Sequence, residues 1–393
     1  MSVDQSKKKV LHIIDGFGTG GAETWLLACV KYLHQHPELG LHFDFLASGG
    51  KKGVFDDEVT GYGATVFYQK YSLKNFFGFR KRFKKILNQN GYAAIHDHQD
   101  FISGWHYLAG VGNLPAQRIA HVHNSLNFVT NYITNPLRWF SFKVGRLLTA
   151  KLATKITGTS EAVMNEYGYD RKPYKEKRVP ATYCGFKVEK FSYNELAKEV
   201  ISKEFNWDYG VKIVLFVGRI GTQTNDTGVN EKNPVFALNI AEELVKRGDE
   251  WKIILAGFKG ELGDAMEEKI NNAGLTNQIK LLGLRKDIPL LMSAADVLLF
   301  PSLWEGLGMV AVEAQAAGLK VVAADNLPDE AFIIKELVKK KSILSPVADW
   351  VDAIIQSASN HTDRKQYERK ISESLFSINN SVQGLAKLYN ISL

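Results

Sequence analysis

The sequence predicts an α/β protein made of two Rossmann-like domains that face each other across a cleft. Its 393 residues exceed the size at which one hydrophobic core keeps growing, so two domains are expected. Short apolar runs alternate with segments of helical length, which is typical of parallel sheets wrapped by helices. The alternation stops once, across residues 178–191, and then starts again.

The apolar runs define the expected strands on both sides of this break. Before it they are Lys9–Asp15, Leu41–Ala47, Ala64–Phe67, Ala93–Asp97, Arg118–His123 and Lys155–Ser160, with helices over Ala22–Leu33 and from Glu161. After it they are Lys212–Val217, Lys252–Ala256, Ile279–Leu282, Asp296–Phe300 and Lys320–Ala324, with helices over Pro234–Arg247 and Asp264–Ala273. We therefore place the domains at 1–185 and 186–374, and we expect a C-terminal helix within 375–393 to return to the first domain.

Bulk composition places the chain among ordinary globular proteins, with 45% apolar and 23% charged residues. No apolar run approaches the ~18 residues that a membrane-spanning helix needs. The polar start and the presence of only two cysteines, Cys29 and Cys184, argue against a signal peptide and a disulfide framework, so a cytoplasmic protein is expected. No Cys/His spacing indicates a metal site, and no nucleic-acid-binding motif accompanies the net charge of +7.

Two basic and aromatic segments are candidates for contact with an anionic membrane surface. Lys74–Leu87 places apolar side chains on one helical stripe, with lysines and arginines mostly off it. Arg138–Arg146 mixes aromatic and basic residues in a similar way. The alternative for each segment is a helix whose apolar stripe faces the core and whose basic side is solvated. Membrane contact would make the protein peripheral on the inner face of the plasma membrane.

The most informative segment follows the strand expected at Asp296–Phe300. Pro301–Gly308 is a glycine-containing loop that leads into a helix, whose unpaired N–H groups and positive dipole end suit a phosphate. Two acids, Glu305 and Glu313, flank this anion site, where a simple phosphate pocket has no use for them. Carboxylates fit there if they accept hydrogen bonds from the hydroxyls of a sugar and a ribose. The ligand indicated is a nucleotide-sugar.

Loops after two other strands suit the same ligand. Arg219 follows one strand and Lys232 precedes the next helix, so a guanidinium and an ammonium on cleft loops can neutralise a leaving diphosphate. Because leaving-group charge grows in the transition state, such cations accelerate the reaction as well as bind. Leu284 and Arg285 follow another strand, where the backbone can read a nucleobase edge. An ordinary capped loop is the alternative there, and surface exposure is the alternative for either cation alone.

A glycine-rich turn follows the first expected strand. Gly16, Gly18 and Gly21 match the dinucleotide-binding pattern G-x-G-x-x-G. The acid expected about 20 residues further on, Asp44, lies inside a strand rather than at its end. Gly20 and Gly21 can instead let the backbone approach a diphosphate. A tight turn between strand and helix is the alternative.

Polar residues end two neighbouring strands of the first domain. They are His121 and His123 on one strand and Asp97 and His98 on the other. Alternation along a strand points His121 and His123 to the same side. Four polar residues at the carboxyl ends of parallel strands favour a ligand site over isolated core residues.

Together these residues resemble the retaining GT-B glycosyltransferases of sequence family four, especially bacterial exopolysaccharide and capsule enzymes. The resemblance covers nearly the whole chain. Its most specific parts are the E-x7-E pattern from Glu305 to Glu313, the continuation of that helix into the strand ending at Val322, and Gly283–Pro289. Less specific are Gly20–Glu23, Gly218–Arg219 with Lys232–Asn233, and Arg118–Asn124.

The resemblance implies a role for each candidate residue. It assigns the donor diphosphate to Arg219 and Lys232, the donor sugar to Glu305 and His123, the ribose to Glu313, and backbone contacts with sugar and phosphates to Gly306, Leu307, Gly20 and Gly21. It also implies retention of the anomeric configuration, no metal or other cofactor, and a front-face reaction in which the departing phosphate takes the acceptor proton. Glu305 is then not a glycosidase-type nucleophile.

The function expected is transfer of a sugar from a nucleotide-sugar, with UDP as the nucleotide, to a glycan acceptor that is polyprenyl-linked. The segment 220–231 is longer and more polar than is usual in the family, which suggests a lid over donor or acceptor. Three alternatives stay open: a non-catalytic GT-B partner that stabilises another glycosyltransferase, an NAD-dependent oxidoreductase, and a nucleotide-sugar epimerase. The cationic pair and the acidic pair together favour the transferase over the first two.

Overall fold

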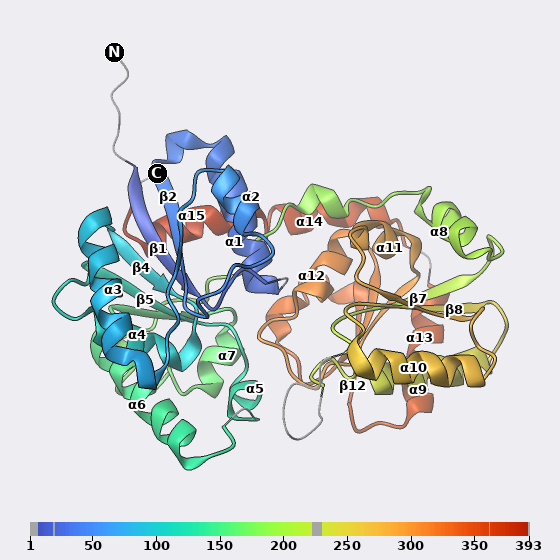
Figure 1. Cartoon of the computed structure of the whole chain (residues 1–393). Helices are drawn as coiled ribbons and strands as arrows, with labels where there is room; N and C mark the ends of the chain where they lie inside the picture. The colour runs from blue at the N-terminus through green and yellow to red at the C-terminus, as the bar shows by residue number, and fades with distance from the viewer. Residues whose placement is uncertain (1–6, 19, 132, 222–229, 361, 392–393) are drawn as a thin grey trace. The chain divides into compact units, whose positions relative to one another are not determined.

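A computed structural model of the chain describes residues 7–18, 20–131, 133–221, 230–360 and 362–391. The chain divides into two compact units, one formed by residues 1–186 with 375–393 and the other by residues 187–374. Each unit contains a six-stranded parallel sheet flanked by helices (Figure 1). The predicted α/β fold class, with two Rossmann-like units, is confirmed.

The sheet of unit 1 has the strand order β3-β2-β1-β4-β5-β6. Its strands are β1 (Lys8–Ile14), β2 (Leu41–Ala47), β3 (Val66–Tyr68), β4 (Ala94–Asp97), β5 (Gln117–Val122) and β6 (Lys155–Gly158). Its helices are α1 (Gly21–Gln35), α2 (Asp56–Gly61), α3 (Phe76–Asn90), α4 (Ser103–Gly110), α5 (Leu126–Asn131), α6 (Pro136–Leu152), α7 (Glu161–Glu166) and α15 (Ile378–Leu388). The central strands are buried on both faces, which explains why they read as short apolar runs.

The apolar stripe of α3 faces the core of unit 1. Phe79, Phe83, Ile86 and Leu87 are buried in the same cluster as Tyr107 of α4. Of the two readings of Lys74–Leu87, the core-facing helix with a solvated basic side is therefore the one that this helix adopts.

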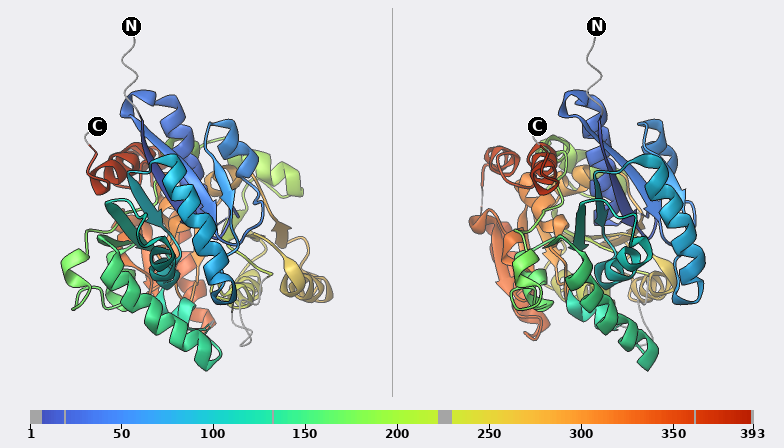
Figure 2. Two further views of the ribbon diagram at one scale, coloured as in Figure 1. Left: turned by 60° about the vertical axis from the view of Figure 1, so that its left-hand side comes forward. Right: turned by 90° about the vertical axis from the view of Figure 1, so that its left-hand side faces the viewer.

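The C-terminal segment packs within unit 1, where Figure 2 shows α15 in red beside the blue N-terminal elements. Trp25 Nε1 of α1 donates a hydrogen bond to Ser381 Oγ at 2.9 Å. The backbone N–H of Phe186 donates to the carbonyl of Phe376, and that of Ile378 donates to the carbonyl of Phe186. These bonds fix the end of the chain on the first sheet.

The sheet of unit 2 has the strand order β12-β11-β10-β7-β8-β9. Its strands are β7 (Lys212–Val217), β8 (Trp251–Ala256), β9 (Ile279–Gly283), β10 (Val297–Phe300), β11 (Lys320–Ala324) and β12 (Val338–Lys341). Its helices are α8 (Ala197–Phe205), α9 (Pro234–Val245), α10 (Gly260–Asn272), α11 (Ile288–Ala294), α12 (Met309–Ala316), α13 (Val347–Ser359) and α14 (Tyr367–Ser372). Because β7 and β10 are neighbours, the loops that follow them lie together at the carboxyl edge of the sheet.

Two further expectations concern membranes and cysteines. Among the described helices, none combines the length and the apolar character that crossing a bilayer requires. Cys29 and Cys184 are both buried, and neither forms a disulfide in this structure.

Candidate functional site

The loop after β7 and the segment that leads into α9 are packed tightly against each other. A Cβ atom at Gly218 would lie 3.2 Å from Cβ and Cγ of Lys232 and 3.2 Å from the ring of Phe216. Glycine at this position therefore lets Lys232 approach the end of β7. Helix α9 begins at Pro234, and Asn233 before it adopts the left-handed conformation.

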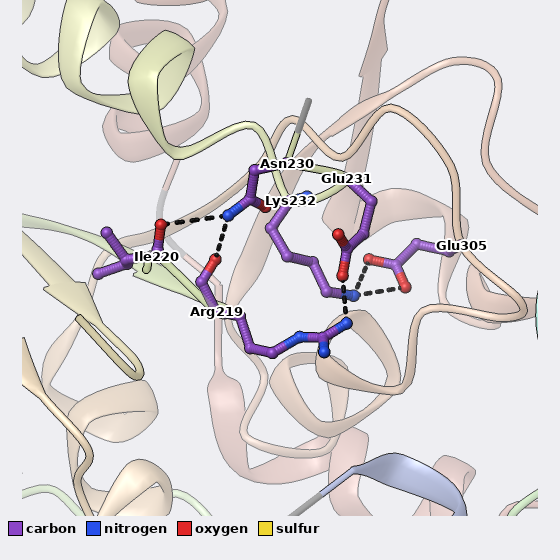
Figure 3. Close-up of polar contacts among 6 residues, drawn as sticks. All are labelled: Arg219, Ile220, Asn230, Glu231, Lys232 and Glu305. Atoms are coloured by element: carbon purple, nitrogen blue, oxygen red, sulfur yellow. Dashed lines mark hydrogen bonds and ion pairs between the residues drawn. The ribbon is translucent and has the colours of Figure 1, made fainter. Parts of the chain in front are cut away.

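Lys232 and Glu305 form an ion pair at the carboxyl edge of the second sheet (Figure 3). Lys232 Nζ donates to both carboxylate oxygens of Glu305, at 2.6 and 2.7 Å. The side chains are 22% and 10% exposed, so the pair is largely shielded but can be reached from solvent. The structure thus joins two residues that the sequence suggests separately, one for a diphosphate and one for a sugar.

Arg219 lies beside this pair and is held by an acid that the sequence analysis does not single out. Its guanidinium pairs with Glu231, whose side chain is buried, while half of the Arg219 side chain stays exposed (Figure 3). Asn230 Nδ2 donates to the carbonyls of Arg219 and Ile220, at 3.2 and 3.1 Å. Glu231 is the only acid in the run between Asn230 and Pro234, next to a lysine that the family pattern marks, and that neighbourhood is the signal that could have found it.

The turn before α12 depends on a glycine. Gly308 has φ of 100°, which a residue with a side chain adopts only with strain, and a Cβ atom there would lie 3.0 Å from the ring of Phe300. Leu307 is buried and α12 begins at Met309. The turn therefore places Gly306 and Glu305 at the N-terminal end of α12, where the positive end of the helix dipole favours an anion.

Glu313 lies in the second turn of α12 and is partly buried. Burial raises the pKa of its carboxyl group to about 8. No hydrogen bond or ion pair joins its side chain to another of the described residues. Such a carboxyl group is free to bond a hydroxyl of a ligand.

This pKa predicts how Glu313 affects stability. Its folded pKa lies above the value of about 4.3 expected in the unfolded chain. The folded state therefore binds the proton more tightly, so the group's contribution to stability falls as pH rises between these values and is lost above about pH 8. The loss has a limiting slope of roughly 1.4 kcal/mol per pH unit. We expect the melting temperature of Glu313→Gln to rise progressively above that of the wild type between pH 5 and pH 8. A difference in melting temperature that does not change with pH would contradict the raised pKa.

Leu284 and Arg285 follow β9, at the same edge of the second sheet. The guanidinium of Arg285 is occupied by two carboxylates, those of Glu204 and Asp287, at 2.6 to 3.0 Å. These hydrogen bonds raise the pKa of Arg285 still further above its usual range. The guanidinium of Arg285 is therefore not free to meet a ligand, whereas the backbone of this loop and the exposed side chain of Leu284 are.

The glycine-rich turn of unit 1 joins β1 to α1. Helix α1 begins at Gly21 after Gly20, which offers no side-chain cap, and both glycines are exposed. Asp44, the acid that a dinucleotide site requires, is buried in β2 and accepts hydrogen bonds from the backbone N–H of Thr65 and the hydroxyl of Tyr92. Because Asp44 is buried and hydrogen-bonded within unit 1, it cannot bind the ribose of a dinucleotide, which argues against an NAD-dependent oxidoreductase.

The strand-end residues of unit 1 divide into two groups. His121 and His123 lie on one side, as alternation predicts, and their rings stack with centroids 4.0 Å apart. Asp97 is buried and bonds instead to His106 Nδ1 and Ser103 Oγ of α4, at 2.8 and 2.9 Å. Asp97 is therefore not part of a site with these histidines, because its carboxylate anchors a helix.

A second acid contacts the backbone beside His123. Asp100 Oδ1 accepts a hydrogen bond from the His123 N–H at 2.9 Å, and Oδ2 accepts one from Asn124 Nδ2 at 2.9 Å. Asp100 has φ of 48°, and burial raises its pKa to about 6.

Of the segment 220–231, which the sequence suggests as a lid, residues 222–229 lie outside the described residues.

Two Rossmann-like units, with two basic residues and an acid at the carboxyl edge of the second, define a protein of the GT-B class. The chain belongs to the group 1 glycosyl transferases. The sequence-family model "Glycosyl transferases group 1" matches residues 197–373, and the sequence-family model "Glycosyltransferase Family 4" matches residues 19–190.

Relatives match along most or all of the chain. It is 27% identical to the glycosyltransferase EpsF of Bacillus subtilis (strain 168), over 99% of this chain and 98% of that protein. It is 26% identical to the capsular polysaccharide biosynthesis glycosyltransferase CapH of Staphylococcus aureus, over 97% and 98%. It is 30% identical to the 2-deoxystreptamine N-acetyl-D-glucosaminyltransferase of Niallia circulans, over 70% of each chain. The expected family is confirmed, and the protein is a glycosyltransferase with capsule-synthesising relatives.

Solved structures share the fold. Anabaena HepE, determined in complex with UDP, has a TM-score of 0.76 at 17% identity and is matched over 98% of this chain and 99% of its own. WaaG, a glycosyltransferase involved in lipopolysaccharide biosynthesis, has a TM-score of 0.71 at 13% identity, over 96% and 99%.

Proposed function

We propose that the protein transfers a sugar from a UDP-sugar to a hydroxyl of a growing, lipid-linked polysaccharide, with retention of the anomeric configuration. The observation that carries this proposal is the Lys232–Glu305 ion pair beside Arg219 at the carboxyl edge of the second sheet. A bound nucleotide-sugar would open this ion pair, because Lys232 would contact its diphosphate and Glu305 its sugar hydroxyls. The complex of HepE with UDP and the capsular relative CapH support the choice of donor and product.

The donor diphosphate would meet both cations. Arg219 offers a fixed fork and Lys232 a point charge, and both stabilise the negative charge that grows on the leaving phosphate. Glu305 would accept hydrogen bonds from donor sugar hydroxyls, and Glu313 would bond the ribose. Because these two cations already neutralise the diphosphate, we expect no metal ion at this position.

The transfer itself would proceed on one face of the sugar. The acceptor oxygen forms the new bond to the anomeric carbon, the bond from that carbon to the diphosphate oxygen breaks, and the acceptor proton passes to the released diphosphate. Glu305 contributes by binding and forms no covalent bond. Gly306 and Leu307 would add backbone N–H groups at the start of α12.

Transfer from an α-linked UDP-sugar is therefore expected to give an α-linked product and free UDP, with a rate that EDTA does not change. NMR of the anomeric proton and release of UDP measure both results. A β-linked product would contradict retention. UDP bound without any transfer, across a panel of sugars and membrane-lipid acceptors, would favour the non-catalytic partner.

A lipid-linked acceptor calls for a surface that meets the membrane, and α6 offers one. Four large apolar side chains of this helix are strongly exposed: Leu137 (65%), Trp139 (45%), Phe140 (60%) and Leu147 (61%). Basic residues lie among them, and Lys143 Nζ is 4.7 Å from the centre of the Trp139 ring. Exposed apolar and basic groups on one helix suit an anionic membrane surface.

We expect the double variant Leu137→Ser/Phe140→Ser to lose at least half of the wild type's binding to vesicles that contain anionic lipid. Each side chain contributes roughly 1.5–3 kcal/mol when it moves from water into an apolar phase, so losing both weakens binding markedly. Co-sedimentation with anionic and with neutral vesicles measures the effect. Leu344→Ser removes a side chain that is 91% exposed in unit 2 and serves as the matched control. Equal binding by the double variant and the control would exclude α6 as the contact.

A further inference from the structure

The carboxyl ends of β1, β4 and β5 gather five histidines in unit 1: His12, His96, His98, His121 and His123. All but His123 are buried, and His123 is partly exposed. Burial lowers the pKa of all five, to about 3 for His12 and His123. The five rings are therefore neutral at physiological pH, and each carries one N–H group and one bare nitrogen.

Three of these rings form a continuous row, which we call the His123 ribbon. His12 Nδ1 lies 3.0 Å from His98 Nε2, and the planes of the two rings are nearly parallel, with 11° between them. His98 Nδ1 lies 2.8 Å from His123 Nε2. The ribbon thus runs from the core of the sheet to the partly exposed His123.

A second row, the Tyr389 ribbon, stacks on the first. The hydroxyl of Tyr389 in the C-terminal segment lies 2.7 Å from His96 Nδ1, and His96 Nε2 lies 3.0 Å from His121 Nδ1. His121 stacks on His123, with ring centroids 4.0 Å apart. The second ribbon packs against the first but shares no hydrogen bond with it among the described residues.

A metal site is the competing reading, because two triples of these rings have nitrogens within 4.8 Å of one another. A metal ion bound to an imidazole lies in the plane of that ring. Each triple contains a stacked pair: His96 with His98, whose centroids are 4.2 Å apart with 26° between planes, or His121 with His123, at 4.0 Å and 22°. One ion cannot lie in the planes of two stacked rings, so the geometry favours hydrogen-bonded ribbons.

Neutral rings allow the His123 ribbon only two proton arrangements. Every N–H must point the same way along the row, either outward from His12 to His123 or inward from His123 to His12. In the outward arrangement His123 accepts at Nε2 and keeps its proton on Nδ1. In the inward arrangement His123 donates from Nε2 and leaves Nδ1 bare.

The inner end of the ribbon decides between them. His12 Nε2 is buried without a hydrogen-bond partner among the described residues, and the rings of Phe43 and Phe45 lie beside His12. The inward arrangement would put a proton on this nitrogen and bury an N–H group that has no acceptor. Buried N–H groups without a partner are rarer in proteins than unsatisfied acceptors. The outward arrangement, in which His12 Nε2 is bare, is therefore favoured.

We propose that His12 and His98 are positioning residues that hold His123 in the Nδ1–H tautomer, so that His123 donates a hydrogen bond to a sugar oxygen and does not act as a base. The identity of the ligand rests on the proposed function, whereas the tautomer does not. The assignment agrees with a reaction in which the acceptor proton leaves on the diphosphate. It also gives a role to the polar side chains that lie deep in the first sheet.

Long-range 1H–15N spectra of the whole protein, labelled in its histidine rings, test the proposal directly. In the wild type at pH 7 we expect a protonated Nδ1 and a bare Nε2 for His123. His98→Phe removes the donor to His123 and is expected to release it into exchange between both tautomers. His121→Phe breaks the other ribbon from the same strand, keeps an aromatic ring against His123, and is expected to leave the Nδ1–H tautomer in place.

A wild-type His123 protonated at Nε2 would overturn the proposal without any variant, so the test does not depend on the variants folding. An unchanged tautomer in a folded His98→Phe would also overturn it, as would saturable shifts of these signals by one equivalent of Zn²⁺. UDP-glucose is expected to move the His123 signals, whereas UDP alone is not. If UDP-glucose alone fails to move the His123 signals, the proposed function is contradicted while the tautomer assignment still holds.

Discussion

Glu305→Ala is expected to lower sugar transfer by about 10²–10³-fold or more, the range seen when one preorganised transition-state contact is removed. The carboxylate is 10% exposed and holds Lys232 by two short hydrogen bonds. Its removal would take away a sugar contact and leave the ammonium misplaced for the diphosphate. Lys232 is partly exposed and can be rehydrated, so the fold should survive. The rate of UDP release with acceptor present, together with the melting temperature, measures both effects.

One further variant separates charge from hydrogen bonding within this pair, and a second variant serves as a control. Glu305→Gln keeps the shape and one acceptor for Lys232, so residual activity above that of the alanine variant would reflect hydrogen bonding without charge. Glu199→Gln removes an exposed carboxylate of α8 and should change neither activity nor melting temperature. Substantial transfer by Glu305→Ala would exclude the role given to this residue.

Most strands could be predicted because a strand buried on both faces must be a short apolar run. The bounds of β2, β7 and β11 agree with the predicted ranges residue for residue. Strand β12 could not be predicted in this way, since three of its four residues are lysines. It lies at the edge of its sheet and is only partly buried. Lysine is tolerated at such an edge, where its charge discourages pairing with a strand of another molecule.

The members of the candidate site could be predicted one by one, but not their pairing. Lys232 and Glu305 are 73 positions apart and meet because β7 and β10 are neighbours, an order that no local pattern encodes. Arg285 shows the same limit, since Glu204, which occupies its guanidinium, comes from a helix 81 positions earlier. Local pattern gives the residue types at strand ends, and strand order decides which of them meet.

The histidine ribbons extend this point to the first sheet. The alternation of His121 and His123 predicts that both point to one side of β5. That His12 of β1 joins them depends on β4 lying between β1 and β5, and the role of Tyr389 depends on the return of the C-terminal segment. Long-range topology thus joins separate polar residues into two hydrogen-bonded rows that stack on each other.

UDP is expected to raise the melting temperature of the wild type, and Arg219→Ala is expected to lose at least half of that rise. At a UDP concentration of 100 times Kd, binding stabilises the folded state by about 2.7 kcal/mol. A charge-assisted hydrogen bond contributes roughly 1.5–3 kcal/mol, so its loss weakens affinity at least about tenfold. Each rise must be taken from the variant's own baseline, because removing Arg219 leaves the buried Glu231 without its cation.

Arg247→Ala provides the control for this loss, since Arg247 pairs with Glu243 and Asp352 in the same unit, away from the loop after β7. It should keep the full UDP-dependent rise. GDP, ADP and NAD, tested in parallel, decide which base the loop after β9 accepts. A rise with NAD alone would restore the oxidoreductase, and a UDP rise of equal size in Arg219→Ala would remove this residue from the diphosphate site. A rise with UDP that depends on Arg219 requires the diphosphate to lie against the loop after β7, which is where the ion pair of Lys232 with Glu305 would have to open.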